Sequence, residues 1–432
     1  MIKFFLIFLV LFLTNNCSFD QRSGIWTQNE RLDKSDAKVK ILFEKEEAIS
    51  KELNPNFIID TPLKIFENRF SYETNDFGAL NFRLNLKKIS RFKFSKIKDF
   101  NYFDPTLGFD KKDIIFFDKK GSILKFDNKS KIIWKKNHYT KLEKKIFPIL
   151  NFSVKKNVLV VTDNLSKYYA IDVNTGKILW SENHNTNFVS HIKIDGDRFY
   201  IIDANNIIYC FSLLDGSKIW EYRTDYELIK SQKKLSIIFD REKVYFINSK
   251  GDLYSLNKKN GNLLWITPTK NPDEIFQTFL LKTSQIVLNN DNLYFSNNMN
   301  NFFSIDKNSG FVNWKQNINS ELKPIVVNEL LFTVSSDGFF FIIDKISGNI
   351  LRINDVFNSF SNRKRKKIAP TGFVLDLNNI YISMNNGKIL MVNLGNGKIQ
   401  SILKISNDKI SKPFVNGNNM FVVKDNEIIR IN

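Results

Sequence analysis

The chain has 432 residues, of which 43% are hydrophobic, so it is long and apolar enough to bury a large core. Lysine and arginine outnumber the acidic residues, 64 against 45, which gives a formal net charge of +19 at pH 7. Because the lysines are scattered along the sequence, the charge does not indicate nucleic-acid binding. The two cysteines exclude a disulfide framework, and the three histidines lack the spacing of a metal site.

The N-terminus has the pattern of an export signal. Residues 1–14 place one lysine before a continuous apolar run that is too short to span a membrane on its own. Cys17 follows at once, and a cysteine in this place is typical of a bacterial lipoprotein, in which the thiol is acylated. We expect a signal peptide over residues 1–16 and a lipid on Cys17, with plain secretion as the alternative. Cys210 lies in a strand pattern and is expected to be a small buried residue.

Residues 17–60 are polar and charged, and they show no alternation of apolar and polar residues. Such a segment is typical of a tether between a membrane anchor and a folded body. The alternative for residues 38–53 is a short amphipathic helix that binds a partner, because their apolar side chains fall partly on one helical face. We expect the folded domain to occupy residues 61–432.

A repeated unit determines the fold of that domain. The clearest copy ends A-I-D-V-N-T-G-K-I-L-W at Ala170–Trp180, where a glycine turn follows a strand and a tryptophan comes four residues later. Six copies carry the glycine, namely Gly176, Gly216, Gly261, Gly310, Gly348 and Gly397. Five copies carry the tryptophan, namely Trp134, Trp180, Trp220, Trp265 and Trp314. Two degenerate copies have Arg352 and Ser401 at the tryptophan position, and the earliest copy has Ser130 at the glycine position.

Successive tryptophan positions are 38 to 49 residues apart, about the length of one four-stranded antiparallel propeller blade. We expect the turn glycines to have positive φ, which glycine adopts without strain, and the tryptophans to pack between blades. Seven units precede a fragment of two strands, Met420–Asn432, with Lys412–Val415 as its inner strand. We expect Gly78–Lys88 to add the missing outermost strand and close the ring. The sequence thus predicts an all-β, eight-bladed propeller.

The unit at Ala170–Trp180 resembles the PQQ-like repeat, which is shared by the quinoprotein dehydrogenases and by the BamB lipoproteins of the outer-membrane β-barrel assembly (BAM) complex. The order of signal, cysteine, tether, closing strand, seven repeats and truncated end resembles BamB. The dehydrogenases hold their quinone beneath two adjacent cysteines and use Ca²⁺ with an aspartate base. This chain has no adjacent cysteines and no acidic cluster placed for Ca²⁺, so we expect no enzymatic activity, no PQQ and no other cofactor.

The resemblance to BamB implies a scaffold that is lipid-anchored at the periplasmic face of the outer membrane. It implies binding to BamA, to other BAM subunits and to unfolded outer-membrane proteins. In the family, two connections between blades contact BamA, and they correspond here to Leu228–Lys234 and Asp273–Lys282. The expected contact residues are Ile229, Lys230, Lys233, Ile275, Phe276 and Phe279. The family's Leu-x-Leu-Arg stretch is only partly kept, and packing against the adjacent blade is the alternative role for the apolar residues.

Two further alternatives follow from the sequence. An exported propeller of this type could instead bind another protein or a polysaccharide. Arg363–Lys367 reads R-K-R-K-K, and we expect it to form a solvated loop, with a contact to anionic lipid or a partner as the alternative.

Overall fold

The computed structural model describes residues 47–59, 79, 83–224, 233–270 and 281–432, and every structural statement below concerns these ranges. The chain divides into two units, Met1–Glu46 and Glu47–Asn432, of which only the second contains described residues. The expected signal peptide, Cys17 and most of the expected tether lie outside the described residues. In the part of the chain that is described, no helix is long and apolar enough to cross a membrane.

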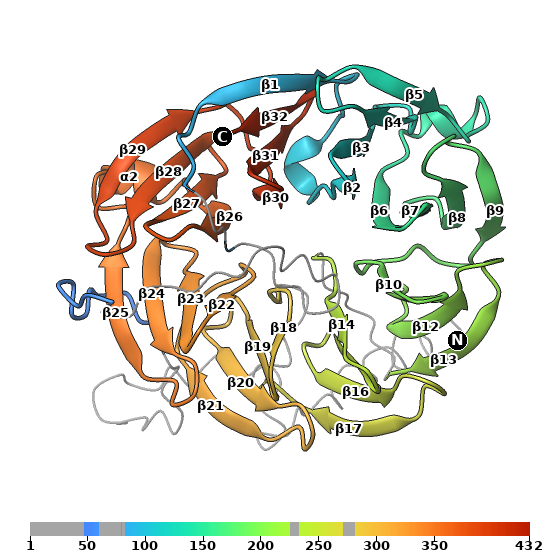
Figure 1. The fold of residues 1–432 in the computed structure, drawn as a ribbon. Coiled ribbons are helices and arrows are strands. Elements are labelled where there is room, and N and C mark those ends of the chain that lie inside the picture. Colours follow the sequence, from blue (N-terminus) through green and yellow to red (C-terminus); the bar gives the residue numbers. More distant parts are fainter. Residues whose placement is uncertain (1–46, 60–78, 80–82, 225–232, 271–280) are drawn as a thin grey trace, which may run out of the picture. The chain divides into compact units, whose positions relative to one another are not determined.

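Eight four-stranded antiparallel sheets form a closed ring, which confirms the predicted eight-bladed propeller (Figure 1). All eight blades line a cavity at the centre of the ring, which we call the central channel. Blades 1 and 2 consist of β2 (Gly108–Asp110), β3 (Asp113–Phe117), β4 (Ile123–Phe126), β5 (Ile132–Lys136), β6 (Leu150–Lys155), β7 (Val158–Asp163), β8 (Lys167–Asp172) and β9 (Ile178–Asn183). Blades 3 and 4 consist of β10 (Lys193–Asp195), β11 (Arg198–Ile202), β12 (Ile207–Ser212), β13 (Lys218–Arg223), β14 (Ile237–Phe239), β15 (Lys243–Ile247), β16 (Leu253–Asn257) and β17 (Leu263–Thr267).

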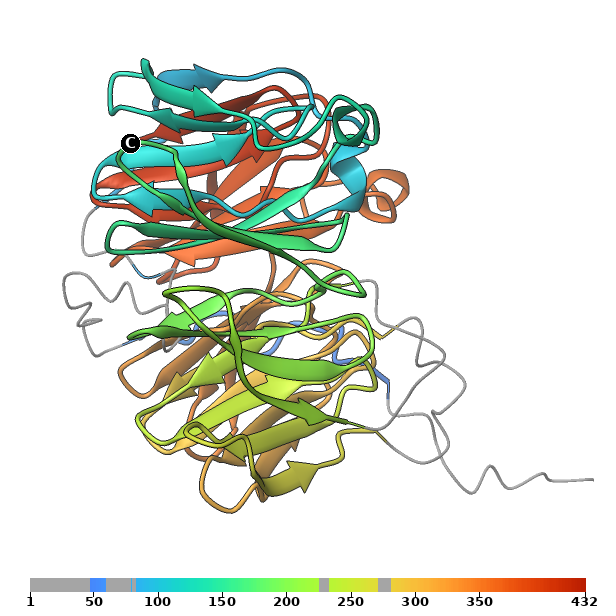
Figure 2. The same ribbon diagram turned by 90° about the vertical axis from the view of Figure 1, so that its right-hand side faces the viewer.

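The second half of the ring repeats this order. Blades 5 and 6 consist of β18 (Val287–Asn289), β19 (Asn292–Ser296), β20 (Phe302–Asp306), β21 (Val312–Gln316), β22 (Ile325–Val327), β23 (Leu330–Val334), β24 (Phe339–Asp344) and β25 (Ile350–Asp355). Blades 7 and 8 consist of β26 (Pro370–Leu375), β27 (Asn379–Met384), β28 (Lys388–Asn393), β29 (Ile399–Lys404), β30 (Phe414–Asn416), β31 (Asn419–Lys424), β32 (Glu427–Ile431) and β1 (Lys88–Lys93). Each blade begins at the channel and ends at the outer rim, and the rim strands β9 and β13 face the viewer in Figure 2.

Blade 8 joins the two ends of the ring. Its outermost strand is β1, which pairs with β32 in antiparallel register, with Arg91 opposite Ile429. Closure of the ring by an N-terminal strand is thus confirmed. The expected range Gly78–Lys88 was wrong, because among its described residues only Lys88 belongs to β1, with Lys87 bonded to Asn432 beside it. The alternation in that range has another cause: Leu84 and Leu86 are buried in a cluster with residues of blades 7 and 8. Leu86 also has a φ of 52°, which is incompatible with a regular strand.

Neighbouring blades are joined by one recurring contact, in which a tryptophan covers the glycine turn of the next blade. A Cβ atom added to Gly216 would lie 2.7 Å from the indole of Trp180, and Gly216 has a φ of 76°. All six turn glycines have positive φ, as predicted, and Ser130 adopts the same conformation with a φ of 71°. The indole Nε1 of Trp180 donates a hydrogen bond to the Leu213 carbonyl at 2.8 Å. Equivalent bonds join Trp134 to Val173, Trp220 to Lys258, Trp265 to Lys307 and Trp314 to Lys345.

Arg352 replaces the tryptophan between blades 6 and 7. Its side chain is fully buried, and its guanidinium donates to the carbonyls of Leu394 and Gly395, the first of which is equivalent to the tryptophan acceptors. A third hydrogen bond, 2.8 Å long, reaches the carbonyl of Phe57 in the N-terminal segment. Burial lowers the pKa of Arg352 to about 10, so the side chain is still charged at neutral pH.

The last part of the expected tether, residues 47–59, lies against the rim instead of extending into solvent. Leu53 and Ile353 exchange backbone hydrogen bonds of 3.2 and 2.9 Å, which form an isolated antiparallel bridge to β25. The Ile49 amide donates to the Asn317 carbonyl, and Glu52 accepts from the Asp355 amide. Residues 47–53 are not helical, so the amphipathic-helix alternative does not hold for this described portion.

Candidate functional site

The candidate site is the mouth of the central channel, at the face where the outermost strand of each blade connects to the innermost strand of the next. A cavity of about 190 Å³ opens there, and every blade contributes to its wall. We call this region the channel mouth and define it by its charged and amide side chains, namely Asp104, His191, Lys193, Lys233, Lys234, Gln285, Glu321, Lys323 and Lys412. Because the turns of an antiparallel sheet alternate between its two ends, the glycine turns lie on the opposite face of the ring.

Serine residues position several of these side chains. Ser190, Ser284 and Ser411 each accept a hydrogen bond from a backbone amide twelve residues later, in the second strand of the blade. Each hydroxyl also donates to the carbonyl of the residue that follows it. This local bonding fixes the chain just before the innermost strand, and the following residues, His191, Gln285 and Lys412, line the cavity. In blade 6, Ser320 also bonds to the second strand, but its hydroxyl donates to the Val334 carbonyl, and Glu321 follows it in the wall.

The charge of the mouth is predominantly positive. Among the described residues, its wall carries five lysines and two carboxylates, Asp104 and Glu321. Lys193 is only 5% exposed, and burial, together with the neighbouring charge of Lys412, lowers the pKa of its amine to about 7. Partial burial opposes the ionisation of Asp104, but the charges of nearby lysines, led by Lys233, hold its pKa below the usual value.

The imidazole of His191 is a neutral member of this wall. Burial and the surrounding lysine charges lower its pKa well below 6.5. The Gln285 amide nitrogen lies 2.8 Å from His191 Nε2, so the neutral ring accepts a hydrogen bond from that amide. The pair thus links blades 3 and 5 across the mouth without adding charge.

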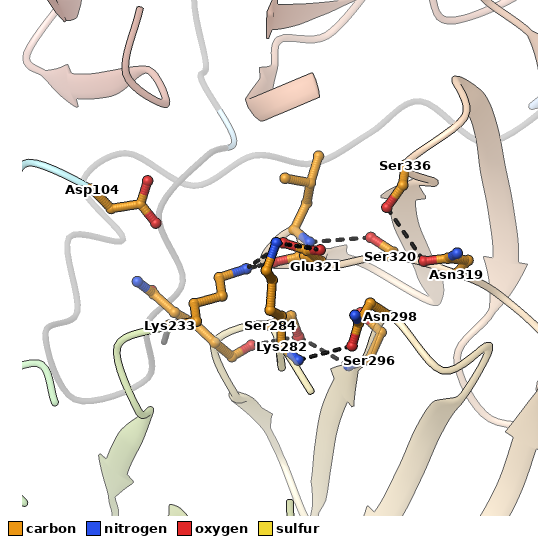
Figure 3. A network of polar contacts seen from close by, with 12 residues as sticks. Asp104, Lys233, Lys282, Ser284, Ser296, Asn298, Asn319, Ser320, Glu321 and Ser336 are labelled. Carbon is orange, nitrogen blue, oxygen red and sulfur yellow. Dashed lines mark hydrogen bonds and ion pairs between the residues drawn. The ribbon is translucent and has the colours of Figure 1, made fainter. Parts of the chain in front are cut away.

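Glu321 is the centre of an ion-pair network (Figure 3). Lys233 Nζ lies 3.8 Å from one carboxylate oxygen, and Lys282 Nζ lies 3.6 Å from the other. Lys233 also donates to the Glu321 carbonyl. Figure 3 shows both lysines extending toward Glu321, with Asp104 on the other side of Lys233. Since Lys233 and Lys282 belong to the two expected partner-binding connections, the described ends of those connections meet at one carboxylate.

The sequence located this region only in part. Lys233 lies at the mouth, whereas Ile229, Lys230, Ile275, Phe276 and Phe279 lie outside the described residues. Sequence reasoning missed His191, Lys193, Glu321 and Lys412. The signal that could have found three of them is a serine before an innermost strand, because the residue after that serine differs from blade to blade while the strands stay alike.

The remaining sequence candidates lie away from the mouth. Cys210 is fully buried, and burial raises the pKa of its thiol to about 12, so it is an inert core residue. The basic stretch begins in a short helix, α2 (Asn362–Arg365), and its Arg365 pairs with Asp355 while the four other cations are exposed. Among the described residues, no group of three or more histidine, cysteine or acidic side chains could hold a metal ion.

The chain resembles known proteins in sequence and in fold. A family model described as outer membrane protein assembly factor BamB matches residues 119–354. No curated protein matches the chain. The structure of BamB from Moraxella catarrhalis superposes with a TM-score of 0.66 at 15% identity, covering 80% of this chain and 100% of that one. A quinohemoprotein alcohol dehydrogenase from Pseudomonas putida HK5 superposes with a TM-score of 0.59 at 9% identity, covering 83% and 78%. At these identities, the structural likeness shows the fold alone.

Proposed function

Because the chain belongs to the family of outer membrane protein assembly factor BamB, we propose that it is a non-catalytic scaffold subunit of the BAM complex. In this role it binds BamA and contacts other BAM subunits. It also contacts unfolded outer-membrane proteins and aids the folding and insertion of these proteins. Family membership supports the general role. The proposed contact residues are supported by the structure of the channel mouth.

The observation that carries the proposal is the convergence of two connections at Glu321. Lys233 and Lys282 come from separate blades, and both pair with the same carboxylate. A partner that binds both connections meets a pre-organised pair of ends, which lowers the entropy lost on binding. The lysines also provide a positive field that steers an acidic partner surface toward this face. We propose Ile229, Lys230, Ile275, Phe276 and Phe279 as the remaining contact residues.

The proposed location is the periplasmic face of the outer membrane, with a lipid on Cys17. This part rests on the sequence pattern of residues 1–17. The proposed organisation is a signal peptide over 1–16, a tether over 17–60 and the propeller over 61–432. The contacts of residues 47–59 with the rim give the tether a defined attachment point between blades 5 and 6.

The absence of enzymatic activity is also part of the proposal. The propeller of a quinohemoprotein dehydrogenase has a similar fold, so the fold does not distinguish a scaffold from an enzyme. The support comes from chemistry, because the sequence contains no adjacent cysteines to cover a quinone. The wall of the mouth is lined by lysines where a Ca²⁺ site needs carboxylates.

The test is co-purification from solubilised membranes of the organism that makes the protein. We expect the tagged full-length chain to retain BamA, and we expect Lys233→Glu with Lys282→Glu to reduce retention about tenfold by placing like charges around Glu321. The matched control is Lys131→Glu with Lys177→Glu, which reverses two exposed lysines on the glycine-turn face. Retention of an unrelated protein or a polysaccharide in place of BamA would overturn the assignment.

A third variant separates surface charge from local order. Adding Glu321→Lys to the double reversal restores two opposite-charge pairs in the same positions. If the partner recognises the lysine charges, this triple variant still fails to retain BamA. If the partner needs only the ordered ends of the connections, the triple variant recovers retention.

A further inference from the structure

The channel mouth also has the features of a ligand site, and these do not depend on the scaffold role. Lys193, Lys234, Lys323 and Lys412 arrive from blades 3, 4, 6 and 8, which are far apart in the sequence. They line the same cavity of about 190 Å³. A cavity of this size admits a small molecule and excludes a folded chain. We propose that the channel mouth binds a small soluble anion that carries one or two phosphate groups.

The balance of charge favours an anion. Lys282 and Lys409 lie at the edge of the cavity and pair with its two carboxylates, at 3.6 Å from Glu321 and 3.8 Å from Asp104. With the five lysines of the wall, seven lysine amines therefore surround two carboxylates among the described residues. Burial lowers the pKa values of Lys193 and Lys234 to about 7, so these two amines are partly neutral at pH 7 and the other five carry the excess charge. In a partly enclosed site, water screens this excess less than it would on an open surface, so a multivalent anion gains more energy there.

The types of side chain indicate phosphate. Among the described residues, the wall contains lysines and no arginine, so it offers no planar fork for bidentate binding of a carboxylate or a phosphate. Ammonium groups on flexible stems act as point charges and can surround a tetrahedral group from several blades at once. The Gln285 amide and the Thr371 hydroxyl add neutral hydrogen-bonding groups to the same wall.

The buried position of Lys193 gives the site a dependence on pH. Burial and the Lys412 charge both favour the neutral amine, and a bound anion opposes both effects. The other charged or titratable groups of the wall are His191, Lys233, Lys234, Lys323, Asp104 and Glu321. Anion binding at neutral pH should therefore be accompanied by proton uptake, and affinity should fall as the pH rises above 7.

The experiment is calorimetric titration of the purified full-length chain with pyrophosphate and with inorganic phosphate, in sodium chloride of matched ionic strength. We expect one pyrophosphate to bind per chain, more tightly than phosphate. We expect Lys193→Met with Lys412→Met to weaken binding at least tenfold. The control, Lys131→Met with Lys177→Met, removes the same charge from the opposite face and should leave affinity unchanged. Should the first pair fail to fold, Lys234→Met with Lys323→Met makes the same test.

Three results would overturn the proposal. The first is that pyrophosphate releases no more heat than sodium chloride does. The second is that the mouth variants bind pyrophosphate with unchanged affinity, and the third is that the control pair loses as much affinity as the mouth variants do. A parallel flotation with phosphatidylglycerol vesicles distinguishes the two sources of phosphate. If vesicles bind through Lys193 and Lys412 while pyrophosphate does not, the ligand is a lipid headgroup and the soluble-anion proposal is wrong. The titration uses the purified chain without any partner protein. If it detects no anion binding, the co-purification with BamA can therefore still succeed, and the two proposals fail separately.

Discussion

The interfaces between blades and the channel mouth use the repeat in opposite ways. At each of five interfaces, a tryptophan in the equivalent position covers a turn of the next blade and donates to the equivalent carbonyl. At the mouth, equivalent positions after a serine carry histidine, glutamine, glutamate and lysine in different blades. The contrast teaches that repetition maintains the ring, and it is the basis of our proposal that the positions that vary between blades form the binding surface.

Arg352 shows that an interface can also depart from the repeat. It keeps the hydrogen bond of the tryptophans to the next blade and adds a bond to Phe57 in the N-terminal segment. Tryptophan has a single donor and cannot make both bonds, whereas the guanidinium has five. The substitution therefore coincides with an interface to which the N-terminal segment is attached, in addition to its backbone contacts with blades 5 and 6.

The largest expected effect comes from breaking a standard interface. Trp220→Ala removes an indole that is 8% exposed and opens a cavity between blades 3 and 4. We expect the free energy of unfolding to fall by about 3–5 kcal/mol, measured by urea denaturation. Tyr102→Ala, at a side chain that is 89% exposed, is the control and should change it by less than about 0.5 kcal/mol. Equal effects of the two changes would show that the tryptophan does not maintain the ring.

A smaller effect is expected at the Arg352 interface. Arg352→Met keeps much of the side-chain volume but leaves the buried Leu394 carbonyl and two partly buried carbonyls without their donor. We expect a loss of about 2–3 kcal/mol together with faster proteolysis after residues 47–59 detach from the rim. Arg363→Met, in the exposed basic stretch, is the matched control. Loss of stability without faster cleavage in that segment would refute the role of Arg352 in its attachment.

The smallest effect concerns the mouth and appears as a dependence on pH. The folded-state pKa of Lys193, about 7, lies below its unfolded value of about 10.4, so the unfolded chain binds more protons between these limits. Stability should therefore rise as the pH increases from about 7 to about 10. Lys193→Met should reduce this rise and increase stability at pH 7, whereas Lys177→Met should not. The measurement is the midpoint of urea unfolding at pH 7 and pH 9 for the unmodified chain, Lys193→Met and Lys177→Met. The same rise of the midpoint with pH in all three proteins would contradict the prediction.

The difference between the two regions also explains what the sequence could predict. The blades were predictable because Trp134 to Trp314 and their glycines recur at regular spacing, so each copy supports the others. The range of the closing strand was wrong because the alternation of Leu84 and Leu86 reflects packing beside blades 7 and 8. The mouth was mostly missed because Lys193, Glu321 and Lys412 are far apart in the sequence and meet only when the ring closes. Likewise, nothing near Phe57 indicates its contact with Arg352.

The most direct test of the account places a photo-crosslinking amino acid at one position on each face of the ring. Position 282 lies beside Glu321 at the channel mouth, and position 311, where Phe311 is 77% exposed, lies in a glycine turn on the opposite face. In intact cells, we expect a covalent adduct with BamA from position 282 and none from position 311. An adduct with BamA from position 311 alone, or from neither position, would contradict it.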